Sequence, residues 1–174
     1  LGDVYKRQGG KGGFIMVAHP IQTIPGSGEL VRLNATVQDL ANTPDDSYRY
    51  ELVKGIMLRM PPPQEEHGQI SSLLIEALAP YCRTHQMRAR LVTDIGYELQ
   101  GSGIAPTVLA PDVSIIRVPK AAGETYSHQA PLLAVEIASP SRSRLYLKDK
   151  AELYLGAGTA LVWVVWPDTQ MVDV

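Results

Sequence analysis

A strand–helix–strand pattern in the second half of the chain constrains the fold more than any other feature. The run PLLAVEIAS at 131–139 is typical of a buried strand, and ALVWVVW at 160–166 is apolar on both faces. Between them a helix is expected over 142–155, capped by Ser139 or Ser141 and ended by two glycines. A strand that follows a helix in this way could pair in parallel with the strand before it through a right-handed crossover.

The earlier part of the chain supplies the remaining elements of a mixed domain. We expect a short helix at 36–42, followed by a hairpin at 48–63 that turns at Lys54-Gly55. An amphipathic helix is expected at 70–82, and two strands at 89–99 and 107–118. The order helix, three strands, helix, strand predicts an α/β (α+β) fold with a central mixed sheet flanked by helices. Its first three strands are expected to form an antiparallel meander.

The two ends of the sequence lack the pattern of a folded domain. The opening LGDVYKRQ resembles translated sequencing-adapter read-through, so residues 1–15 are interpreted as a non-native leader and 16–34 as a flexible tail. A single domain is then expected over 35–174. The alternating TQMVDV at 169–174 stops without a turn or cap, which is typical of a truncated end.

Charge and cysteine content narrow the class of protein. The 16 basic and 18 acidic residues give a net charge of −2, so no global basic field indicates nucleic acid or an anionic membrane. One cysteine, no secretory signal and no apolar run of membrane-spanning length indicate a cytoplasmic protein. Basic residues do cluster locally, as either a solvated face or a phosphate-contacting rim, at Arg142, Arg144, Lys148 and Lys150.

Two acids interrupt otherwise apolar strands. Asp112 follows a proline in VLAPDVSII, and Glu136 lies inside LLAVEIAS. If these strands are neighbours, the carboxylates repel each other and one takes up a proton unless a cation lies between them. Hard oxygen ligands of this kind suit Mg²⁺, or Mn²⁺ as an alternative, and the backbone carbonyl of Ile137 could supply a further oxygen.

Each acid also has a simpler interpretation. Asp112 could be a strand-end acid that is hydrogen-bonded to the backbone, and Glu136 could form a salt bridge to a helix lysine. Two lysines, Lys148 and Lys150, follow on the next predicted helix. If a metal ion at the two acids serves phosphodiester hydrolysis, either lysine could position the attacking water. Either could equally be a solvated helix lysine. They flank the apolar stripe of that helix on opposite sides, so periodicity does not choose between them.

Six motifs together resemble a known family. YELVKG, PPPQEEHGQI, APDVSII, AVEIASPS, KAELYLGAG and LVWVVWP occur in an order that resembles the Uma-type putative restriction endonuclease family of the PD-(D/E)XK nuclease superfamily. The resemblance covers about residues 35–174. It implies a restriction-endonuclease-like αβββαβ core, preceded here by the hairpin. It further implies that Asp112 and Glu136 are the two metal-binding acids and that Lys150, rather than Lys148, is the catalytic lysine.

Two other residues match family motifs, and one departs from them. Glu51 in YELVKG and His67 in EEHGQI match motif positions and are carried as additional catalytic candidates. Each also has a structural interpretation: Glu51 could be a cross-strand partner, and His67 could be a residue at the start of a helix. Family members often carry an acid four residues before the lysine, where this chain has Tyr146.

The resemblance implies a bacterial, magnesium-dependent endonuclease that hydrolyses DNA phosphodiester bonds. No membrane partner is expected, and a homodimer would supply the two active sites that double-strand cutting requires. The alternative is a catalytically inactive module with a nuclease fold that binds nucleic acid or protein, which the net charge and Tyr146 keep open. A small-molecule enzyme is disfavoured because the sequence has no glycine-rich phosphate-binding loop.

Overall fold

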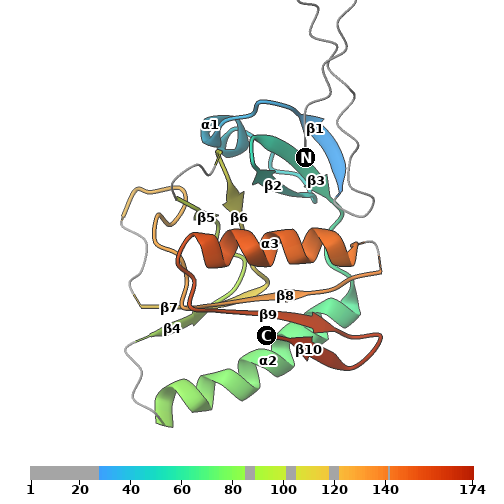
Figure 1. Ribbon diagram of the computed structural model, residues 1–174, viewed down its shortest axis with the longest axis vertical. Helices are drawn as coiled ribbons and strands as arrows, with labels where there is room; N and C mark the ends of the chain where they lie inside the picture. The colour runs from blue at the N-terminus through green and yellow to red at the C-terminus, as the bar shows by residue number, and fades with distance from the viewer. Residues whose placement is uncertain (1–27, 85–88, 101–104, 118–121, 141) are drawn as a thin grey trace, which may run out of the picture.

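The computed structural model describes residues 28–84, 89–100, 105–117, 122–140 and 142–174, so the leader expected over 1–15 lies outside the described residues (Figure 1). The elements in chain order are β1 (Glu29–Arg32), α1 (Val37–Ala41), β2 (Arg49–Val53), β3 (Ile56–Met60), α2 (Glu65–Thr84), β4 (Arg90–Val92), β5 (Tyr97–Glu98), β6 (Val108–Leu109), β7 (Val113–Ile116), β8 (Leu133–Ile137), α3 (Arg144–Gly156), β9 (Leu161–Trp166) and β10 (Met171–Asp173).

These strands form two sheets. The first has the order β1-β3-β2-β6-β5, and the second has the order β10-β9-β8-β7-β4. Within the second sheet β4, β7 and β8 pair antiparallel, whereas β8 and β9 pair in parallel through the α3 crossover. The predicted mixed sheet, with its antiparallel meander and its helical crossover, is therefore confirmed.

The first sheet is built on the predicted hairpin. Lys54 and Gly55 both have positive φ angles, of 50° and 77°, so the two-residue turn has the twist that joins β2 to β3. Strand β1 pairs antiparallel with β3. Residues 29–32, which we expected within a flexible tail, are thus part of this sheet.

Two segments that read as single strands are divided between the sheets. The expected strand over 89–99 is β4 and β5, separated by Asp94 with a φ of +53°, and the strand over 107–118 is β6 and β7, separated by Pro111. Strand β4 pairs with β7 in the second sheet, and β5 pairs with β6 in the first. A positive φ and a missing backbone donor both interrupt a ladder, so the chain bends here and connects the sheets.

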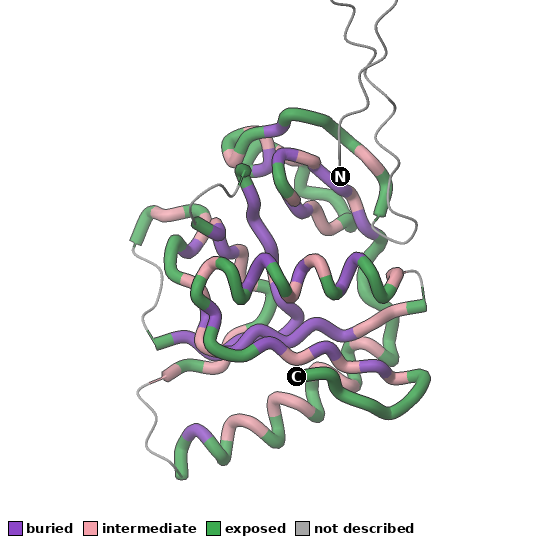
Figure 2. Tube along the Cα trace, in the orientation of Figure 1, coloured by how far each residue is buried: buried purple, intermediate pink, exposed green. Residues whose placement is uncertain are grey.

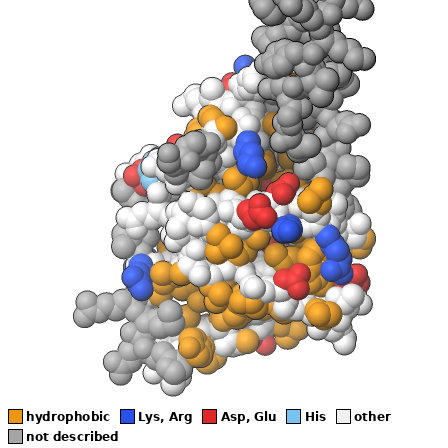
Figure 3. Space-filling model, in the orientation of Figure 1, with side chains coloured by type: hydrophobic (Ala, Val, Ile, Leu, Met, Phe, Trp, Pro, Cys, Tyr) orange, Lys and Arg blue, Asp and Glu red, His pale blue; other side chains and the backbone are white. Residues whose placement is uncertain are grey.

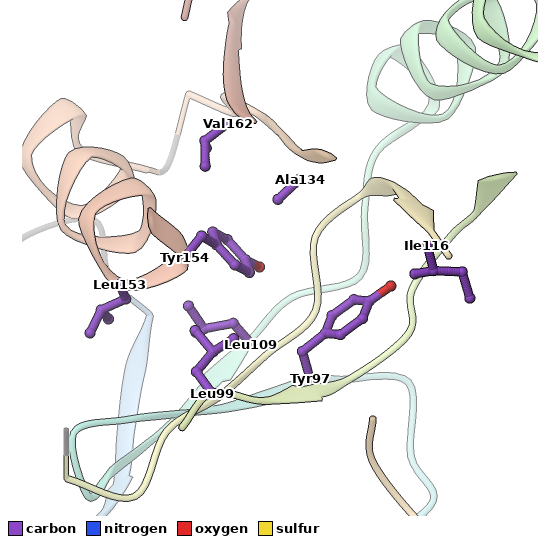
Figure 4. Packing of buried hydrophobic residues seen from close by; sticks show 8 residues of the cluster. All are labelled: Tyr97, Leu99, Leu109, Ile116, Ala134, Leu153, Tyr154 and Val162. Atoms are coloured by element: carbon purple, nitrogen blue, oxygen red, sulfur yellow. The ribbon is translucent and has the colours of Figure 1, made fainter. Parts of the chain in front are cut away.

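The second sheet is covered on both faces by helices (Figure 1). Cys82 of α2 packs with Val113 and Val135, which confirms its predicted place in the core. On the other face, Leu153 and Tyr154 of α3 pack against strand residues of both sheets, Leu109, Ala134 and Val162, and against Leu99, which follows β5 (Figure 4). The buried stretches of β7 and β8 lie between these layers (Figure 2).

Helix α3 begins two residues later than expected, at Arg144. Its cap is Ser143, whose hydroxyl accepts a hydrogen bond from the Tyr146 N–H, and not Ser139 or Ser141. The later start leaves Arg142 in the loop that follows β8. The outer face of α3 exposes acidic and basic side chains that lie close together (Figure 3). None of the helices in the described segments has both the length and the apolar character that crossing a bilayer would need.

Candidate active site

The register of the second sheet brings the two strand acids together. Val113 is paired with Val135, and Ser114 with Ala134, so continuing this register places Asp112 opposite Glu136. Side chains alternate between sheet faces, and both acids therefore share the face covered by α3. The Ile137 N–H donates to Asp112 Oδ2 at 2.7 Å, which is the backbone hydrogen bond of the simpler interpretation of Asp112.

Lys150 lies between two carboxylates. Its Nζ is 2.7 Å from Glu136 Oε1 and 2.8 Å from Glu51 Oε1. Both Lys150 and Glu136 are fully buried, whereas Lys148 is exposed on the outer face of α3. The structure thus brings Lys150, and not Lys148, to the acids. The salt bridge of the simpler interpretation of Glu136 is present, and it also places an ammonium group beside the proposed metal ligand.

Two tyrosines of α3 complete this network. The Tyr146 hydroxyl donates to Glu51 Oε2 at 2.8 Å, and the Tyr154 hydroxyl donates to Glu136 Oε1 at 3.0 Å. Residues at 146, 150 and 154 follow each other at intervals of four and share one helix face. Sequence reasoning treated Tyr146 only as a departure from the family, although this spacing around Lys150 could have identified both tyrosines.

Asp112 also has partners on α2 and β2. His67 of α2 places Nε2 3.0 Å from Asp112 Oδ1, and Arg49 of β2 places Nη1 3.3 Å from the same oxygen. Arg49 also pairs with Asp94. The structure therefore brings both His67 and Glu51 to the site. Arg49 was missed, although it lies two residues before Glu51 and so on the same face of β2.

Opposing effects set the acidity of the carboxyl groups. Burial would raise the pKa of Glu51, but the charges of Lys150 and Arg142, with hydrogen bonds from Lys150 and Tyr146, lower it overall. Burial would also raise the pKa of Asp112, but His67 and the Ile137 N–H reduce it to about 2. Both groups are therefore held as carboxylates at neutral pH.

Glu136 has the opposite balance. Burial is the largest influence and raises the pKa of this carboxyl group, and the neighbouring carboxylates of Asp112 and Glu51 add to the effect against the opposing charge of Lys150. The pKa of Tyr154 is raised well above its ordinary value by burial and by Glu136, so its hydroxyl remains a donor. The two strand acids thus differ in proton affinity, which is the expected result of a shared buried position.

Asp112 is expected to make folding stability depend on pH in the acid range. Its pKa is lower in the folded chain than the ordinary value of 3.8, so its stabilising contribution is present above pH 3.8 and disappears as the pH falls to about 2. The expected loss is about 2 kcal/mol. Urea unfolding between pH 5 and pH 2 measures this loss. In Asp112→Asn the free energy of unfolding should fall less steeply over the same pH range than in the wild type. The same pH dependence of the unfolding free energy in both proteins would contradict the low pKa of Asp112.

The donor set fits a divalent cation with oxygen ligands. Glu136 Oε2 is buried and has no hydrogen-bond partner, so it retains an acceptor for a cation. The Ile137 N–H faces Asp112, and the N–H and C=O of a strand residue point to the same edge, so the Ile137 carbonyl faces that side too. No cluster of three Asp, Glu, His or Cys side chains suited to a metal occurs among the described residues. Mg²⁺, which binds one or two carboxylates and keeps several waters, suits such a sparse set.

The fold and the site together define a protein of the restriction-endonuclease-like class, with two strand acids at the centre of a mixed sheet and a lysine on the crossover helix. The family model described as Uma2, putative restriction endonuclease, matches residues 36–174, and the chain belongs to this family. The fold is similar to a crystal structure of a putative nuclease belonging to DUF820 from Anabaena variabilis ATCC 29413. That likeness has a TM-score of 0.67 at 24% identity, over 79% of this chain and 76% of the other. No curated protein gives a significant match.

Proposed function

We propose that this protein is a magnesium-dependent endonuclease that hydrolyses phosphodiester bonds of DNA. One observation carries the proposal: Asp112 and Glu136 occupy opposite positions on neighbouring strands, and Lys150 Nζ lies 2.7 Å from Glu136. Buried acids in such a pair are costly unless cations compensate them. Family membership supports the same reaction.

Asp112, Glu136 and the carbonyl of Ile137 would hold the ion. A bound Mg²⁺ would supply Lewis-acid polarisation of the phosphate and a lower pKa for a nearby water. Both acids lie on the α3 face of the sheet, the face on which Lys150 lies. Mn²⁺ has the same preference for oxygen ligands and would serve in its place.

Lys150 would position the attacking water and stabilise negative charge that develops on the phosphate. The water oxygen forms a new P–O bond as it loses a proton, one P–O ester bond breaks, and the departing alkoxide takes up a proton. Glu51 and Tyr146 fix the ammonium group, because Glu51 Oε1 binds Lys150 and Glu51 Oε2 accepts from Tyr146. They are positioning residues in this scheme, and His67 has the same function for Asp112.

The test is cleavage of supercoiled plasmid DNA by the purified protein in Mg²⁺, Mn²⁺, Ca²⁺ or EDTA. We expect nicked or linear products in Mg²⁺ and Mn²⁺ and none in EDTA. Titration calorimetry in the absence of DNA should show one of these ions binding, and Asp112→Asn should abolish that heat. A protein that binds DNA but neither ion would contradict the proposal and identify the non-catalytic module.

A further inference from the structure

Basic side chains separate the buried acids from a surface pocket. The pocket has a volume of about 240 Å³ and lies where β8 ends beside the start of α2. Arg49, His67 and Arg142 line it, and each of them also approaches an acid, Asp112 for the first two and Glu136 for the third. A ligand in the pocket would therefore meet these basic groups before it reached either carboxylate.

The walls of the pocket favour a ligand that accepts hydrogen bonds. Pro61, Pro62 and Pro63 form part of the lining, and proline has no backbone donor. Three lining side chains can carry positive charge, whereas Glu66 is the acidic member of the lining. Positive charge is thus concentrated at Arg49, His67 and Arg142, and the proline wall offers apolar contact.

Arg142 is the lining residue with unmet bonding capacity. Its Nη1 is buried and has no hydrogen-bond partner, although the side chain is 12% exposed. The nearest carboxylate oxygen, Glu136 Oε2, is 3.6 Å away, too long for a hydrogen bond, and is itself without a partner. The other nitrogen, Nη2, donates to the weak acceptor Met60 Sδ at 3.4 Å. A buried charged donor without an acceptor is costly, and a ligand oxygen would remove that cost.

We propose that Arg142 binds a phosphate of the DNA substrate in this pocket, and this inference rests on the proposed nuclease function. A guanidinium group presents two parallel N–H donors that match two phosphate oxygens. Glu136 holds the positive charge near the site, while the long ion pair leaves Nη1 without an acceptor and Nη2 with only the weak acceptor Met60 Sδ. Arg142 is then a substrate-binding residue that places the phosphodiester next to Asp112 and Glu136.

Binding measured without catalysis tests this assignment. Fluorescence anisotropy with a short labelled DNA duplex, in EDTA and in Ca²⁺, gives Kd as a function of salt for the wild type, Arg142→Met, Arg142→Lys and Lys148→Met. Loss of a charge-assisted contact should weaken binding by Arg142→Met roughly tenfold to a hundredfold. The slope of log Kd against log salt should fall by about one.

The other variants separate charge from geometry. Arg142→Lys retains the charge beside Glu136 but not the paired donors, so it should keep the salt slope and recover only part of the affinity. Lys148→Met removes a charge from the exposed face of α3 and should bind as the wild type does. Melting temperatures check that the variants fold. If Arg142→Met does not fold, the affinity of Arg142→Lys tests the phosphate site.

The outcomes distinguish this inference from the nuclease proposal. Wild-type affinity and salt slope in the folded Arg142 variants would overturn the phosphate site, while cleavage by the wild type would leave the nuclease proposal standing. Binding that depends on Arg142, with no cleavage in Mg²⁺ or Mn²⁺, would support the phosphate site and overturn the nuclease. A wild type that binds no DNA in EDTA or Ca²⁺ would overturn the assignment of Arg142.

Discussion

Asp112→Asn and Glu136→Gln are each expected to lose magnesium-dependent DNA cleavage by at least about a thousandfold, because several kcal/mol of transition-state stabilisation depend on the ion. Each change replaces a carboxylate with an amide of the same shape. In Glu136→Gln the remaining carbonyl oxygen can still accept from Lys150 and Tyr154, which donate to Oε1 in the wild type. The fold should therefore survive in both variants.

Single-turnover cleavage rates in Mg²⁺ measure this loss, and circular dichroism and thermal melting establish that the variants are folded. Glu152→Gln is the matched control, because Glu152 is an exposed acid on the same helix as Lys150. It removes one carboxylate without touching the site and should cleave at the wild-type rate. Undiminished cleavage by either site variant, with Glu152→Gln also unchanged, would show that the two acids do not hold the ion.

Lys150→Met is expected to cost about 3–5 kcal/mol of folding free energy as well as cleavage, because removal of one partner leaves buried charge without compensation. Lys150 contacts Glu51 and Glu136 at once, and all three side chains are buried. Methionine fills a similar volume but neutralises neither carboxylate. Arg142 is the remaining nearby cation, and it is 3.6 Å from Glu136.

Urea unfolding followed by far-ultraviolet circular dichroism measures that cost. Adding Glu51→Gln to Lys150→Met removes one of the two stranded carboxylates, so the double variant should be more stable than Lys150→Met alone. Lys148→Met removes an exposed lysine from the same helix and should change stability by no more than about 0.5 kcal/mol. A Lys150→Met protein as stable as the wild type would show that the buried lysine does not compensate the acids.

The layout of the second sheet could be predicted from local patterns. The strand–helix–strand segment that carries Glu136 has the periodicities of its elements, and a helical connection between two strands favours the parallel pairing that β8 and β9 show. Asp112 and Glu136 were identified because charges inside apolar strands need a partner. Their shared face follows from the register of β7 and β8, which short apolar strands do not specify by themselves.

The contacts between distant segments could not be predicted in this way. Glu51 and Lys150 are 99 residues apart, and no local pattern relates a strand of one sheet to a helix that covers the other. Lys148 and Lys150 were equivalent by periodicity, and only the family resemblance favoured the residue that the structure buries. The division of the β4–β5 and β6–β7 segments was also missed, because an extended segment gives the same pattern in either sheet.

Glu51 reaches the site from β2 in the first sheet, whereas Glu136 belongs to β8 in the second, and Lys150 joins them. The geometry of the proposed catalytic site is therefore a property of the interface between two layers of the molecule. Partial separation of these layers would remove one anchor of the ammonium group before any helix unravels, so inactivation should precede global denaturation. A ligand that binds only when the two sheets are in contact should in turn make their separation less favourable.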